Sequence, residues 1–250
     1  MAKSSRLTSE ERKRSILAAA VPLFAAKGFN GTTTKDIAKA AGVSEALLYR
    51  HFPSKESIYN DLKCYCMQEK ASLTELISNL EPSTSTLVHI IYFITAAIVE
   101  GHEMDFHHHV DHDHMHRLLI KSYLEDGAFA RLFIEEKLII WEGILSQSVA
   151  AAVEAGEMMA DWIDDDCRWW FAHHLAACIA MLNLPKEPVI GYGLDREQLV
   201  DQATRFSLRG MGLSDEAIAK YYNPAALALF MQRMESASQL STEITPTPSE

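Results

Sequence analysis

The chain has 250 residues, a length that suits one large domain or a small domain joined to a larger one. Hydrophobic residues make up 48% of it, enough for a sizeable core, but no apolar run has the roughly 18 residues of a membrane span. The N-terminal charges are not followed by an apolar segment, so they do not form a signal peptide. We therefore expect a cytoplasmic protein with no membrane partner.

The net charge of −11 is divided unevenly along the chain. Residues 1–55 contain ten lysines and arginines and four acids, a balance of +6, so the remainder carries −17. Such asymmetry between segments points to nucleic-acid contact by the basic part. Neutralisation of phosphates supplies most of the non-specific affinity of proteins for DNA, and the acidic remainder would stay off the duplex.

Apolar residues recur with the helical period through nearly the whole chain, and no convincing strand alternation is present. The sequence therefore predicts an all-α fold. In chain order, the predicted helices cover residues 9–27, two short segments within 33–52, then 54–79, 84–101, 116–126, 128–156, 161–184, 195–210 and 214–235, the last interrupted at Asn223-Pro224.

Local signals set several helix ends. Thr8 and Glu11 have the spacing of a capping box at the start of the first helix, and Gly28 is expected to end it. Pro22 lies inside this helix and should kink or loosen it, because proline leaves one helix carbonyl without its partner. The tail 236–250 has few large apolar residues and is predicted to be disordered.

Residues 33–52 contain two short helical patterns separated by Ala41-Gly42-Val43-Ser44. Thr33 and Ser44 are residue types that cap helix N-termini, and Gly42 permits a left-handed turn between the helices. Two short helices joined by a tight glycine turn form the helix-turn-helix, whose second helix fits the DNA major groove. This pattern predicts a DNA-binding regulator and not an enzyme.

Several motifs follow one another in a fixed order over residues 9–60. They are Leu23-Phe24, Lys27-Gly28-Phe29, Thr32-Thr33-Thr34, Asp36-Ile37-Ala38, Ala41-Gly42-Val43-Ser44, Leu48-Tyr49, His51-Phe52 and Ser54-Lys55-Glu56. Together they closely resemble the tetracycline-repressor (TetR) family of bacterial transcriptional regulators. The resemblance implies an N-terminal three-helix helix-turn-helix domain over 1–53 and a larger helical ligand-binding and dimerisation domain over 54–235. It implies a ligand-responsive repressor that binds a palindromic operator as a homodimer.

The candidate DNA-binding residues lie at helix N-termini and on the outer side of the second short helix. Hydroxyls and free backbone amides at a helix N-terminus can hold a phosphate. Tyr49 resembles the family's phosphate-contacting tyrosine, and Lys55, in the first turn of the next helix, can grip the DNA backbone. The full predicted set is Thr33, Thr34, Lys35, Ser44, Glu45, Ala46, Tyr49, Arg50, His51 and Lys55.

The resemblance places the dimer interface on the last long helices, about 161–184 and 195–210. The first of these is too apolar to be a solvated helix, which favours a partner surface. A small-molecule effector would enter the helical core and shift the spacing of the two recognition helices. Large apolar residues are the candidates for its pocket: Met67, Phe93, Phe129, Phe133, Trp141, Trp169 and Phe171.

Residues 102–116 hold seven of the eleven histidines. Imidazoles and carboxylates spaced by four residues suit a divalent transition metal such as Zn, Ni or Cu. The candidate metal ligands are His107, His108, His109, Asp111, His112 and His116. Three interpretations remain open: a solvated polar segment, a metal-responsive regulator, and a metal-dependent hydrolase. The last rests on an H-x-H-x-D-H pattern that would need a β-rich sandwich around it.

Overall fold

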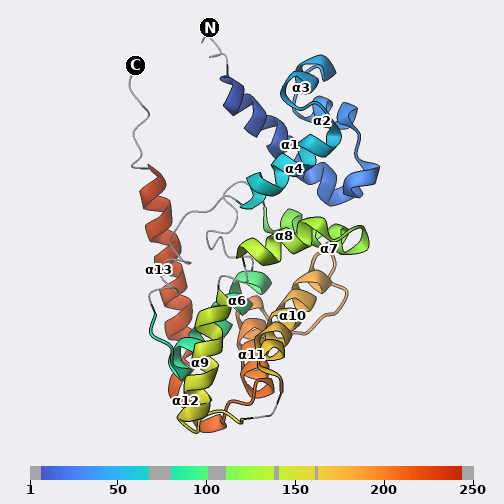
Figure 1. Ribbon diagram of the computed structural model, residues 1–250. Coiled ribbons are helices and arrows are strands. Elements are labelled where there is room, and N and C mark those ends of the chain that lie inside the picture. The colour runs from blue at the N-terminus through green and yellow to red at the C-terminus, as the bar shows by residue number, and fades with distance from the viewer. Residues whose placement is uncertain (1–6, 68–79, 101–110, 138–140, 161–162, 244–250) are drawn as a thin grey trace. The chain divides into compact units, whose positions relative to one another are not determined.

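The computed structural model describes residues 7–67, 80–100, 111–137, 141–160 and 163–243. Within these ranges the chain is helical, with one isolated bridge between Met158 and Leu213 and no strand, so the predicted all-α fold is confirmed. Its contacts divide it into two compact units, which are described separately (Figure 1). None of the helices in the described ranges combines the length and the apolarity that crossing a membrane requires.

The N-terminal unit contains six helices of the described chain. They are α1 (Ser9–Gly31), α2 (Thr34–Ala40), α3 (Glu45–His51), α4 (Lys55–Met67), α7 (His112–Leu124) and α8 (Ala128–Lys137). Helix α1 packs against α2, α4 and α7, and α8 packs against α4 and α7. The unit is thus larger than the segment 1–53. The domain boundary after residue 53 stays a prediction, since packing and DNA contact need not divide the chain at the same residue.

Helix α1 begins as the sequence predicts and runs past its predicted end at Lys27 to Gly31. The Thr8 hydroxyl accepts the Glu11 N–H at 3.2 Å and the Glu11 carboxylate accepts the Thr8 N–H at 2.7 Å, which completes the capping box. Gly28 has φ +70°, the left-handed region that favours glycine, and interrupts the helix there. It is the one residue of α1 with non-helical dihedral angles, so the helix continues through Pro22 without a break.

The core of the N-terminal unit draws on all six helices. It joins one apolar face of α1 to buried residues of the other five helices. The members with under 2% exposure are Ile16, Ala20, Phe24, Ile37, Leu48, Phe52, Ile58, Leu62, Cys66, Leu118 and Phe129. Helices α7 and α8 therefore contribute to the same core as the helix-turn-helix.

The body unit is built around one helix that is apolar on every side. Its members are α6 (Thr84–Glu100), α9 (Glu142–Glu154), α10 (Asp165–Asn183), α11 (Arg196–Gly210), α12 (Asp215–Tyr221) and α13 (Pro224–Glu243). Helix α6 packs against each of the other five, and nearly all of its side chains are buried. A helix with no polar face is stable only when neighbours cover it all round, which is the arrangement here.

Two predicted segments differ from the structure. Residues 128–156 were expected to form one helix, but α8 and α9 are separate and belong to different units, and Trp141 is the N-cap of α9. The apolar period continues across the break because both helices bury a face, although in different cores. Helix α13 extends to Glu243, into the segment predicted as a disordered tail. Residues 68–79, the end of the predicted helix 54–79, lie outside the described ranges.

A buried arginine forms hydrogen bonds with backbone carbonyls of the body unit. Arg168 of α10 is 2% exposed. Its guanidinium donates to the carbonyl of Met211, in the turn after α11, and to the carbonyl of Met159 at 3.2 Å. The same region is joined by a hydrogen bond of 2.9 Å from the Met159 N–H to the Gly212 carbonyl. The arginine thus satisfies backbone carbonyls that turns leave without partners inside the protein.

We expect Arg168→Met to destabilise the protein by about 3 kcal/mol, because hydrogen bonds to charged groups contribute about 1.5–3 kcal/mol each. Chemical denaturation followed by circular dichroism measures the loss. Arg209→Met is the matched control. The Arg209 Nε is 2.7 Å from Asp215 Oδ1 in an exposed ion pair, whose removal costs under about 1 kcal/mol. Equal losses in the two variants would contradict the structural role of Arg168.

Candidate nucleic-acid interface

Helices α2 and α3 form the predicted helix-turn-helix. The Thr33 hydroxyl caps α2 by accepting the Asp36 N–H at 3.1 Å, and the Ser44 hydroxyl caps α3 by accepting the Leu47 N–H at 3.1 Å. Gly42 has φ +65° between them, as the turn was predicted to need. Both predicted caps and the left-handed turn are therefore confirmed.

Helix α3 presents a polar outer face because its apolar side is buried in the core. Leu48 is fully buried. Glu45, Ala46, Tyr49 and Arg50 are exposed, and His51 is half-buried. These side chains come from the helix that would enter the major groove in this motif, where base edges carry the sequence information.

Two predicted DNA-binding residues from different helices meet on this surface. The Tyr49 hydroxyl of α3 lies 3.0 Å from the Thr34 hydroxyl of α2, and Tyr49 is 47% exposed. Lys35 follows Thr34 and is exposed. Two hydroxyls and an ammonium at the start of α2 are the groups that bind a phosphate oxygen, since hydroxyls donate hydrogen bonds to it and the lysine supplies the opposite charge.

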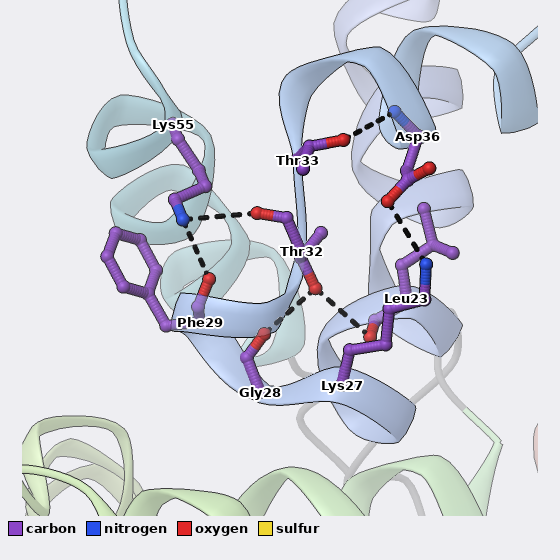
Figure 2. A network of polar contacts seen from close by, with 8 residues as sticks. All are labelled: Leu23, Lys27, Gly28, Phe29, Thr32, Thr33, Asp36 and Lys55. Atoms are coloured by element: carbon purple, nitrogen blue, oxygen red, sulfur yellow. Dashed lines mark hydrogen bonds and ion pairs between the residues drawn. The ribbon is translucent and has the colours of Figure 1, made fainter.

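The ammonium of Lys55 is directed elsewhere. Its Nζ donates to the Phe29 carbonyl at 2.8 Å and to the Thr32 carbonyl at 3.1 Å (Figure 2). The side chain is half-buried, and the Nζ lies 4.3 Å from the centre of the Phe29 ring. Lys55 therefore binds carbonyls at the end of α1 and directly after it, and its contact with the DNA backbone stays a prediction.

Residues that the motif did not single out hold this same segment. Thr32 is 1% exposed, and its hydroxyl donates to the Gly28 carbonyl at 2.8 Å and to the Leu23 carbonyl at 3.2 Å (Figure 2). Lys27 donates to the Asp36 carboxylate at 3.0 Å. This contact, followed by the hydrogen bond with Thr33, lowers the pKa of Asp36. A threonine run beside a glycine was the one sequence signal for this network.

The histidine segment is described only in part. His107, His108 and His109 lie outside the described residues. Asp111, predicted as a metal ligand, is the N-cap of α7 and accepts the backbone N–H groups of Asp113 and His114. Within the described ranges, no group of three or more His, Cys, Asp and Glu residues is placed to hold a metal ion.

His112 and His116 lie one turn apart on α7. Their ring centroids are 4.2 Å apart, and His116 Nδ1 is 3.2 Å from the His112 carbonyl. Burial, with a smaller contribution from His112, lowers the pKa of His116 to about 4, so its imidazole is neutral at pH 7. The hydrolase interpretation is wrong, because this end of the motif starts a helix and no strand is present among the described residues.

The predicted effector residues fall into two groups. Phe129 and Phe133 pack in the core of the N-terminal unit. Phe93, Trp141 and Trp169 are buried in the body. Phe171 is 55% exposed, and the side chain of Met67 lies outside the described part of the chain. The pocket itself stays a prediction.

Exposed apolar residues gather on the helices assigned to dimerisation. On α10, Phe171, Cys178 and Met181 are exposed at spacings of seven and three residues, which place them on one side of the helix. On α11, which packs against α10, Phe206 is 70% exposed. Large apolar side chains left in water on one pair of packed helices mark a surface that suits a partner.

The N-terminal region matches a known family and curated relatives. Residues 16–62 match the model described as bacterial regulatory proteins, tetR family. The chain is 49% identical over 53 residues to the biofilm operon icaADBC HTH-type negative transcriptional regulator IcaR of Staphylococcus aureus, covering 21% of this chain and 28% of that protein. It is 45% identical over 51 residues to the HTH-type transcriptional repressor KstR2 of Rhodococcus jostii, covering 20% and 25%. The chain thus matches about a quarter of the length of these relatives.

Solved structures extend the likeness to the fold of most of the chain. A tetR-family regulatory protein from Rhodococcus RHA1 has a TM-score of 0.56 and 17% identity, over 82% of this chain and 98% of that one. AibR, solved in complex with isovaleryl coenzyme A and operator DNA, has a TM-score of 0.53 and 18% identity, over 78% and 97%. Residues 16–62 are thus similar to the TetR family of bacterial regulatory proteins, and the rest of the chain shares the all-α fold of solved TetR-family structures.

Proposed function

We propose that this protein is a transcriptional regulator that binds a palindromic DNA operator as a homodimer and is released by a small-molecule effector. The observation that carries the proposal is the meeting of Thr34 and Tyr49 beside the exposed face of α3. One surface then offers phosphate-binding groups next to side chains that can read base edges. Repression is the favoured sign of regulation, because IcaR is named as a negative regulator and KstR2 as a repressor. Operator binding would place the protein in the cytoplasm.

Dimerisation follows from the length of the recognition helix. Helix α3 has seven residues and covers a few base pairs, so a long operator needs two copies related by a two-fold axis. The exposed residues Phe171 and Met181 of α10 and Phe206 of α11 are the proposed contact surface. Burial of these side chains between two copies would stabilise the dimer, because apolar surface that is exposed in the single chain would be removed from water.

The effector would bind in the body, near the buried aromatic residues Phe93, Trp141 and Trp169. AibR was solved with an acyl-coenzyme A ligand together with operator DNA, which makes an organic effector the favoured class. To release the DNA, the effector must prefer a conformation whose recognition helices mismatch the operator spacing.

A metal-responsive alternative depends on the pair His112 and His116. Their spacing of four residues on α7 places both rings on one face, and the lowered pKa of His116 keeps it unprotonated and able to ligate. The remaining candidate ligands lie at His107, His108 and His109. An organic effector remains our first proposal.

We expect Tyr49→Phe to weaken binding about tenfold for every DNA sequence, because a hydrogen bond to a charged phosphate contributes about 1.5 kcal/mol. Fluorescence anisotropy with a random-sequence duplex and with a duplex selected from a random pool measures the effect. Tyr123→Phe removes the same hydroxyl from another exposed tyrosine and should bind as the wild type does. A loss confined to one duplex would contradict a phosphate contact.

Phe206→Glu is expected to raise the dimer dissociation constant at least about a hundredfold, because a charge replaces an aromatic ring that buries about 150 Å² or more. Sedimentation equilibrium measures the dissociation constant. Leu229→Glu, on the exposed side of α13, is the control and should leave the dimer intact. An unchanged dimer in Phe206→Glu would remove α11 from the interface.

We expect Ni²⁺ to leave the operator affinity of the wild type unchanged, because an organic effector is proposed. The test is anisotropy with the selected duplex over a nickel titration, beside calorimetry of nickel binding alone. The double variant His112→Asn/His116→Asn is run in parallel. If nickel released the duplex from the wild type but not from this variant, the metal-responsive alternative would replace the organic one.

A further inference from the structure

The peptide groups around Phe29 are held from both sides by charged residues of other helices. The Phe29 N–H donates to Glu125 Oε1 at 3.2 Å, and its carbonyl accepts from Lys55 Nζ at 2.8 Å. Lys55 comes from the start of α4 and Glu125 from the end of α7. All of these residues belong to the N-terminal unit. We call Gly28–Thr33, the segment that they hold, the α1–α2 joint.

Lys55 is committed to this joint by three contacts. An ammonium has three N–H donors, and two of those on Lys55 bind the carbonyls of Phe29 and Thr32. Its charge also lies over the Phe29 ring, 4.3 Å from the centroid, where a cation–π interaction is favourable. Figure 2 shows the lysine side chain beside Phe29, with dashed lines from its nitrogen to the two carbonyl oxygens. Two of the three donors of this nitrogen are thus used inside the protein.

Glu125 holds the same joint from α7. Its carboxylate accepts the Phe29 N–H, a backbone donor that follows the left-handed Gly28. A Cβ at Gly28 would lie 2.5 Å from Glu125 Oε1, so any other residue there would displace the carboxylate. Burial, followed by the negative charge of Glu125, raises the pKa of the neighbouring Tyr59 to about 12.

The joint leads directly into the phosphate-binding surface. Thr32, whose carbonyl Lys55 binds, is followed by Thr33, the N-cap of α2, and then by Thr34, whose hydroxyl meets Tyr49. The position of the joint therefore sets where α2 begins. Because α2 packs against α3, it also sets where the recognition helix lies on the N-terminal unit.

We propose that Lys55 and Glu125 are positioning residues for DNA binding: they fix the α1–α2 joint by holding Phe29 from both sides, and neither contacts the DNA. This inference rests on the proposed DNA-binding function. It predicts that removing either residue weakens DNA binding without changing the number of phosphates that the protein neutralises.

The salt dependence of binding separates positioning from phosphate contact. The logarithm of the binding constant falls with the logarithm of salt concentration by about 0.9 for each phosphate neutralised. Lys55→Met keeps the alkyl stem and removes the charge, and Lys35→Met is the matched control on an exposed lysine of α2. Glu125→Ala removes the acceptor, whereas Glu125→Gln retains a carbonyl oxygen that can accept the Phe29 N–H. The probe is the duplex selected from a random pool, and thermal unfolding of each variant is followed in parallel.

We expect Lys55→Met to lower DNA affinity about tenfold with the wild-type salt slope, and Lys35→Met to lower the slope by about 0.9. Glu125→Ala should weaken binding several-fold, and Glu125→Gln should restore it. Because Glu125 is exposed, its variants are expected to fold and test the joint even if Lys55→Met does not.

Two results would overturn the inference. A salt slope in Lys55→Met reduced as much as in Lys35→Met would make Lys55 a phosphate ligand. If both Lys55→Met and Glu125→Ala lowered the melting temperature but left DNA affinity unchanged, these contacts would stabilise the fold without affecting DNA binding. A wild-type protein that binds no duplex would be a different failure, that of the proposed function itself.

Discussion

Seven residues are too few for a helix to persist in water, so α2 and α3 depend on the side chains that they bury. Ile37 of α2 and Leu48 of α3 are fully buried in the core that α1 and α4 supply. Once these two residues point inward, the helical period decides what remains outside. Tyr49 and Arg50 then face solvent, and Thr34 comes within hydrogen-bonding distance of Tyr49. The surface proposed to face DNA is in this sense a consequence of the core beneath it.

The same core explains why the N-terminal unit extends beyond the helix-turn-helix. Leu118 of α7 and Phe129 of α8 complete it, although they follow α3 by more than sixty residues of sequence. Helix α7 also ends at the α1–α2 joint through Glu125 and begins in the histidine segment at His112.

Charged and exposed apolar residues are distributed unevenly along the chain. The first 55 residues carry +6 and the remainder −17, which favours DNA contact by one part and discourages it by the other. In the body, five helices pack against α6, yet Phe171 of α10 and Phe206 of α11 remain exposed to solvent. Such residues reduce the solubility of a single chain and gain stability when a second copy covers them.

The sequence by itself determined the helical class, the caps at Thr8, Thr33 and Ser44, and the left-handed turn at Gly42. These features depend on neighbours within about four residues, so local spacing specifies them. Only the tertiary structure decided that Lys55 binds the carbonyls of Phe29 and Thr32, and that Glu125 accepts a hydrogen bond from an amide 96 residues away. It also divided 128–156 between two cores. A periodic pattern indicates that one face of a helix is buried, but it does not indicate which element covers that face. The covering element depends on packing between segments that come together only when the chain folds.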